Sequence, residues 1–125
     1  KSKMASAANV NLSAATLKVT GFVVGNTFEL EIDFVPPGSF DFTGATGKCR
    51  IVKKSDNTTV QDLTTGGGGV TFPTSDSIRL FSADTATALW PICDLLADVE
   101  VTFQDTTVRT LIDLEIRPVK PITPA

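Results

Sequence analysis

Alternation of hydrophobic and polar residues with a period of two is the dominant pattern along this chain. It is clearest in FELEIDF, residues 28–34, where phenylalanine, leucine and isoleucine alternate with acidic residues. Successive side chains of a strand point to opposite faces of a sheet, so this pattern predicts a half-buried strand. Two longer segments alternate in the same way. Their expected inward positions are Ala97, Val99, Val101 and Phe103 in the first segment, and Val108, Thr110, Ile112, Leu114 and Ile116 in the second.

Turn-forming residues separate the expected strands. Pro36-Pro37-Gly38, Ser55-Asp56-Asn57 and Gln104-Asp105-Thr106 predict turns, and the four glycines of 66–69 predict a mobile surface loop. Further strands are expected at 48–51, 58–63, 70–72 and 77–81, with an additional edge strand within 17–26. About seven short strands at this spacing are typical of a two-layer β-sandwich.

Only SADTATAL, residues 82–89, has helical character, with Ser82 as the expected cap and alanines in the turns that follow. The segment GATGKC, residues 44–49, resembles the end of a phosphate-binding loop. Its first glycine position is occupied by Phe42 and its final hydroxyl position by Cys49. The residues after it alternate as a strand does, so we interpret Thr43-Gly44-Ala45 as a turn that leads into that strand.

The length of 125 residues predicts one domain, and a net charge of -3 with scattered signs provides no basic surface for nucleic acid or for an anionic membrane. No apolar run reaches the roughly 20 residues that a membrane helix needs. The N-terminal residues contain no continuous apolar segment of the kind that a secretory signal has. The sequence therefore favours synthesis in the cytosol. Nucleic acid and membrane are therefore not expected as partners.

The chain contains no histidine and two cysteines, Cys49 and Cys93, which we expect to be two buried free thiols; the alternative is a cross-sheet disulfide, which needs an oxidising compartment. Without histidine, hydrolase mechanisms that use a histidine base are excluded. The carboxylates of Glu29, Glu31 and Asp33 alternate with apolar residues and are expected on a solvated strand face. The sequence therefore predicts a protein that is not an enzyme, with no metal site and no cofactor.

The order of motifs resembles the immunoglobulin-like β-sandwich domain of tailed-phage virion proteins, including the N-terminal region of baseplate upper proteins. The resemblance spans about 26–123 and departs from the family pattern around 92–95, where the usual glycine and tyrosine are replaced. The matching segments are Asp41–Thr46, Cys49–Ile51, Val60–Thr64, Ile78–Leu80, Ser82-Ala83 with Thr85-Ala86, Ala88–Pro91, Asp98–Val101 and Ile116–Val119.

This resemblance implies an all-β, immunoglobulin-like antiparallel sandwich of 7–8 strands with one short helical turn and extended termini. It also implies a structural part of a tail, baseplate or fibre adaptor, located in the virion after assembly in the host cytoplasm. Expected partners are other copies of the chain, in a symmetric homo-oligomer, and neighbouring virion proteins. Two alternatives remain: a capsid decoration or head-fibre protein, and a sandwich that binds carbohydrate, such as a host surface glycan, through loops such as 66–69 and through Trp90.

Three segments are expected: a flexible N-terminal arm at 1–16, the sandwich at 17–117, and a proline-rich C-terminal arm at 118–125. The arms would contact neighbouring subunits by adding a strand to a sheet. Trp90 is weighed both as a core residue and as an interface residue, because large aromatic side chains serve in both places. The candidate interface residues are Trp90, Pro118, Val119, Pro121 and Ile122.

Overall fold

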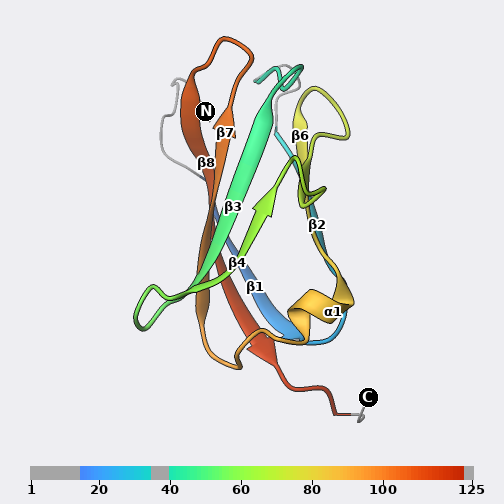
Figure 1. Cartoon of the computed structure of the whole chain (residues 1–125), viewed down its shortest axis with the longest axis vertical. Coiled ribbons are helices and arrows are strands. Elements are labelled where there is room, and N and C mark those ends of the chain that lie inside the picture. Colours follow the sequence, from blue (N-terminus) through green and yellow to red (C-terminus); the bar gives the residue numbers. More distant parts are fainter. Residues whose placement is uncertain (1–14, 35–39, 123–125) are drawn as a thin grey trace.

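The structure is a computed structural model that describes residues 15–34 and 40–122. These residues form eight strands and one short helix (Figure 1). The elements are β1 (Ala15–Val23), β2 (Phe28–Asp33), β3 (Thr46–Lys53), β4 (Thr59–Thr64), β5 (Val70–Thr71), β6 (Ser77–Ser82), α1 (Asp84–Thr87), β7 (Leu95–Thr102) and β8 (Val108–Val119). In this part of the chain, no helix has the length and apolar character needed to cross a membrane.

The strands form two sheets that face each other (Figure 1). One sheet has the order β1-β8-β7-β3-β4 and the other has the order β2-β6-β5. All neighbouring strands are antiparallel except β1 and β8, which run parallel. The second, fifth and sixth strands thus form one sheet, and the third, seventh and eighth belong to the other, as in immunoglobulin domains. The predicted all-β, immunoglobulin-like sandwich is confirmed.

The core lies between the sheets and follows from the period-two pattern. Inward residues of β3, β7 and β8 are fully buried, whereas the residues between them are mostly charged and exposed. In β2, Phe28 is buried and the three acidic residues Glu29, Glu31 and Asp33 are exposed, as predicted. The residues with no exposed surface include Cys49, Ile51, Val70, Ile78, Leu80, Leu95, Val99, Val101, Ile112 and Ile116.

The prediction for the first residues of β8 is wrong. Val99 pairs with Ile112 but Glu100 pairs with Thr110, so Leu111 is an extra residue in β8 at a bulge. A bulge reverses the alternation of side chains on one side of it. Val108 and Thr110 are therefore exposed, and they do not share the buried face of Ile112.

The predicted domain boundaries of 17 and 117 lie two residues inside the observed strands, since β1 begins at Ala15 and β8 ends at Val119. Pro118 was assigned to the C-terminal arm, but it belongs to β8 and pairs with Phe22. The last residue of β8 that pairs with β7 is Ile116, so at Pro118 the strand has passed the end of that neighbour. A proline is tolerated there because it interrupts no central ladder.

Local interactions account for the connections. The predicted turn at 43–45 is confirmed, with the Ala45 amide donating to the Phe42 carbonyl and Gly44 at a φ of 73°. The turns at 55–57 and 104–106 are also present. Ser82 does not cap α1; the N-cap is Ala83, which makes no side-chain capping bond.

The glycine-rich loop is held more closely than the sequence predicted. The Gly69 amide donates to the Thr64 carbonyl, and the Gly69 carbonyl accepts from the Phe81 amide. A Cβ at Gly69 would lie 2.8 Å from the Cβ of Leu63, so this glycine allows the backbone to pack against β4. The predicted turn at Pro36-Pro37-Gly38 and the N-terminal arm before Ala15 lie outside the described residues.

Candidate interaction surface at the helical end

One end of the sandwich carries α1, the segment that follows it and the exit of β8, and we call it the helical end (Figure 1). Several contacts hold its parts together. The Val24 amide donates to the Val119 carbonyl at 3.1 Å. The Thr87 hydroxyl donates to the Asn26 carbonyl at 2.6 Å and accepts from the Gly25 amide at 3.1 Å. The turn after β1 therefore ties α1 to the end of β8.

An aromatic cluster fills the interior of this end. The Trp90 ring lies 5.4 Å from the Phe22 ring and 5.5 Å from the Phe28 ring, measured between centroids. Phe22 and Phe28 meet edge to face at 5.3 Å. Trp90 is 4% exposed, so the structure supports its interpretation as a core residue. From its buried position, the Trp90 side chain supports the residues that precede and follow it in the chain.

Two polar donors of this interior share one acceptor. The Trp90 indole Nε1 donates to the Gln61 side-chain oxygen at 2.8 Å, and the Ser82 hydroxyl donates to the same oxygen at 2.9 Å. One glutamine of β4 thus connects the strand β6 to the segment after α1. Because buried donors without partners are costly, this arrangement fixes the indole and the backbone around it.

Large apolar side chains project into solvent from the same end. The exposed fraction is 85% for Leu89 and 45% for Ile92, on the two sides of Trp90. It is 39% for Val119 and 100% for Ile122, at the end of β8 and just beyond it. Of the five large hydrophobic residues that are exposed in the described part of the chain, only Val108 lies elsewhere. Because exposed apolar side chains are concentrated at this end, we take it as the candidate interaction surface.

The candidate residues chosen from sequence all belong to this end, but not all lie on its surface. Val119, Pro121 and Ile122 are exposed, whereas Trp90 and Pro118 are buried below them. Leu89 and Ile92 are surface residues that sequence reasoning missed. The available signal was two large apolar residues flanking Trp90-Pro91 outside any alternating pattern.

Charged side chains border the apolar residues. Arg117 pairs with Asp94 at 3.5 Å, and Lys54 pairs with Glu115 at 3.0 Å. The hydrogen bond from Lys54 and its charge lower the pKa of Glu115, with smaller contributions from other cations. Exposed pairs of this kind add little stability. An apolar centre with a charged border is nevertheless the usual composition of a protein interface.

The two cysteines do not share one environment, which corrects the prediction of two buried thiols. Cys49 is buried in β3, and burial is the main cause that raises the pKa of its thiol to about 12. Cys93 is exposed at the helical end, next to Ile92, because the segment between α1 and β7 does not follow a strand pattern. The described residues include no group of three or more Cys, Asp or Glu placed to hold a metal ion.

No protein-family model matches the chain, and no curated protein sequence matches it. Among solved structures, CopC from Methylosinus trichosporium OB3b is similar, with 10% identity, a TM-score of 0.49, and coverage of 88% of this chain and 91% of that one. Murine CRIg is also similar, with 15% identity, a TM-score of 0.38, and coverage of 82% and 92%. These likenesses carry no argument about function, and the fold is assigned from the strand order of the chain itself.

Proposed function

We propose that this chain is a non-enzymatic structural component of a tailed-phage virion, in the tail, the baseplate or a fibre adaptor. The motif resemblance carries the proposal. Its motifs coincide with the elements that build the sandwich: 41–46 leads into β3, 60–64 lies in β4, 78–80 lies in β6, and 98–101 lies in β7. The resemblance thus involves the order of the strands and turns of the whole domain.

Assembly would use the helical end, and its occupant would be the same end of another copy of the chain. The apolar residues Leu89, Ile92, Val119 and Ile122 come from two segments, so a twofold contact can place one segment against the other. Ile122 is fully exposed although it is a large aliphatic residue. Burying such side chains contributes about 25 cal/mol per Å² of apolar surface.

The oligomeric state tests this contact. We expect the purified chain to form a homo-oligomer, measured by light scattering after size exclusion, and the double variant Leu89→Ser with Ile122→Ser to be a monomer. Val108→Ser is the matched control, because Val108 is 52% exposed but lies at the opposite end of the sandwich. A double variant with the mass of the wild type would contradict the proposed contact.

Immunogold electron microscopy on phage particles from the source culture tests the virion location. Label at the tail tip would support a baseplate or fibre-adaptor part, and label around the head would favour a capsid decoration or head-fibre protein. Particles that bind no antibody, with epitopes shown to be accessible, would contradict both. This result is independent of the oligomeric state in solution.

Truncation of the C-terminal arm tests its role in assembly separately from the folding of the domain. Removal of 120–125 deletes Ile122 but keeps Val119, which pairs with Val23 and accepts a hydrogen bond from Val24. We expect this variant to keep the cooperative unfolding of the full chain and to lose incorporation into particles. Normal incorporation would count against a role for the C-terminal arm.

A further inference from the structure

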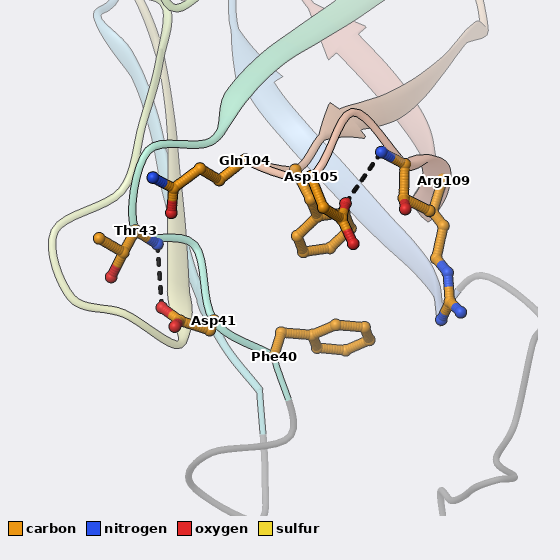
Figure 2. Close-up of a pocket in the computed structure, with 8 residues that line it drawn as sticks. Phe40, Asp41, Thr43, Gln104, Asp105 and Arg109 are labelled. Carbon is orange, nitrogen blue, oxygen red and sulfur yellow. Dashed lines mark hydrogen bonds between the residues drawn. The ribbon is translucent and has the colours of Figure 1, made fainter.

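A second surface feature lies at the opposite end of the sandwich, and we call it the hollow (Figure 2). The end of the β2–β3 connection and the β7–β8 hairpin form it, and its volume is about 560 Å³. The hollow is shallow and open to solvent, and its volume lies within the range of about 300–1,000 Å³ found for small-molecule sites. The residues that line the hollow are Phe40, Asp41, Thr43, Phe103, Gln104, Asp105, Thr107 and Arg109.

Aromatic rings form the apolar part of the hollow. Phe40, Phe42 and Phe103 are nearly parallel, with centroids 5.8–6.2 Å apart. Phe42 is buried, whereas Phe40 and Phe103 are only partly buried and line the hollow. Phe34 and Phe72 pack against Phe42 from the core side, which fixes the position of the group. The hollow therefore contains rigid phenyl surfaces that have no polar atom of their own.

Two carboxylates of the lining are held by the same kind of hydrogen bond, from the amide two residues further along the chain. The Asp41 carboxylate accepts from the Thr43 amide at 3.0 Å, and the Asp105 carboxylate accepts from the Thr107 amide at 3.0 Å. A carboxylate has about four acceptor sites, so these turns leave capacity for further donors. Bonds from the Thr43 hydroxyl and amide lower the pKa of Asp41, and bonds from the Thr107 amide and hydroxyl lower the pKa of Asp105. Both groups are therefore charged at neutral pH.

Donors complete the lining. Figure 2 shows the Phe40 ring between the Asp41 and Arg109 side chains. Among the described residues, Arg109 makes no ion pair within 4.0 Å, so its guanidinium keeps donors for another molecule. The Gln104 side chain lies over Gly44, where an added Cβ would be only 3.2 Å from it. Because Gly44 has no side chain, it leaves room for the Gln104 amide group, which can both donate and accept hydrogen bonds.

We propose that the hollow binds a sugar ring, with the C–H face of the ring on Phe40 and Phe103 and its hydroxyls on Asp41, Asp105 and Arg109. A sugar has an apolar face and a rim of hydroxyls that donate and accept, which matches phenyl surfaces bordered by fixed acceptors and donors. A phosphate group fits poorly, because two carboxylates line the hollow and a single cation does not compensate for them. A purely apolar ligand would leave the charged groups without partners.

The test is binding to a broad glycan array, followed by titration of the best glycan into ¹⁵N-labelled protein. We expect shifts of the Thr43, Thr107 and Arg109 amides. Asp105→Asn keeps an acceptor for the turn but removes the charge, and Arg109→Gln removes the guanidinium. Because a hydrogen bond to a charged group contributes about 1.5–3 kcal/mol, we expect each variant to weaken binding by about tenfold or more.

Asp56→Asn is the matched control. Asp56 accepts from the Thr58 amide at 3.0 Å in the same kind of turn, in the β3–β4 hairpin, and does not line the hollow. We expect it to bind the glycan as the wild type does. The proposal is overturned if no glycan on the array binds, if the shifts map to the helical end, or if all three variants bind equally. Binding of a quaternary ammonium probe such as choline without any glycan would overturn the sugar assignment as well.

This inference is independent of the proposed virion role. A hollow that binds no sugar leaves the oligomerisation and immunogold experiments unaffected, and a chain absent from virions can still bind a glycan here. The carbohydrate alternative suggested by the sequence had placed the contacts in 66–69 and at Trp90. Trp90 is buried and Gly69 packs against Leu63, so of that location only the exposed residues 66–68 are left at the surface.

Discussion

At the helical end the aromatic cluster consists of Phe22, Phe28 and Trp90, whereas at the opposite end it consists of five phenylalanines around the hollow. The first cluster is closed, because the indole N–H is bound by Gln61 and the indole is 4% exposed. The second is open, with Phe40 and Phe103 at its surface. Similar ring packing can therefore close one end of a sandwich and leave a binding surface at the other. The closed cluster also contains a polar group, the indole N–H, which we call the polar handle and which donates to the partly buried Gln61 side chain.

The two ends also present different chemistry to solvent. The helical end combines a closed interior with protruding aliphatic side chains, which suits contact with another protein surface. The hollow combines recessed rings with charged groups in fixed turns, which suits a small polar ligand. Four predictions test this contrast, in order of decreasing effect.

The largest expected effect is on thiol reactivity. Cys93 is exposed at the helical end, whereas Cys49 is buried and its pKa is raised to about 12, so only Cys93 should react in the folded protein at pH 8. A thiol reagent with a chromophore should count one cysteine in buffer and two in denaturant. In the homo-oligomer, the reaction of Cys93 should slow. Rapid reaction of both thiols in buffer would contradict the burial of β3.

The second largest effect is expected for substitutions that remove one aromatic ring from each end of the sandwich. Trp90→Ala should lower the free energy of unfolding by about 3–5 kcal/mol, since it removes a buried indole. Phe103→Ala should cost about 2 kcal/mol or less, because its ring is partly exposed before the substitution. Urea denaturation measures both. Equal losses would mean that the hollow end is as closed as the helical end.

Substitution of one glutamine at each end of the sandwich tests the role of the polar handle. Gln61→Leu leaves the Trp90 indole and the Ser82 hydroxyl without their acceptor and should cost about 2 kcal/mol. Gln104→Leu changes an exposed side chain at the hollow and should alter stability by about 0.5 kcal/mol or less. If the two substitutions had the same cost in urea denaturation, the contrast between a closed and an open end would fail.

The smallest effect concerns acid titration. Because hydrogen bonds lower the pKa of Asp41 and Asp105 below the ordinary value of 3.8, their contribution to stability is present above that value and is lost as the pH falls through the lowered pKa. Amide shifts of Thr43 and Thr107 should report midpoints below 3.8. Asp56, whose pKa is lowered by the same bonds from Thr58, serves as the reference. Midpoints above 3.8 for the first two alone would indicate that the hollow is closed to solvent.

Much of the fold could be predicted because strands are encoded locally. The alternation in 28–34 and 95–103 and the turns at 43–45, 55–57 and 104–106 correspond to observed elements. Predictions from local residue chemistry failed where contacts with residues distant in the sequence determine the structure. Ser82 could cap a helix by its type, but its hydroxyl bonds to Gln61 of another strand. Val108 alternates with Ile112 in sequence, but a bulge at Leu111 turns it outward.

The sequence supplied candidate residues for the interaction surface but not their common location. Trp90 was chosen as a large aromatic residue and the other four from the proline-rich tail, and the structure places all five at the helical end. Which of them face solvent depends on which sheet covers them. Pro118 is buried because β1 lies beside it, and Ile122 is exposed because the chain has passed the sheets.

By itself, the sequence determined the class of the fold, the turns and most of the inward faces, because a period of two and turn-forming residues act over a few positions. Only the tertiary structure decided that Trp90 is enclosed, that Cys93 is exposed, and that Asp41 and Asp105 line the same hollow. These features depend on contacts between strands and loops far apart in the chain, such as that between Gln61 and Trp90, which are 29 positions apart. No local pattern specifies which distant segments will meet.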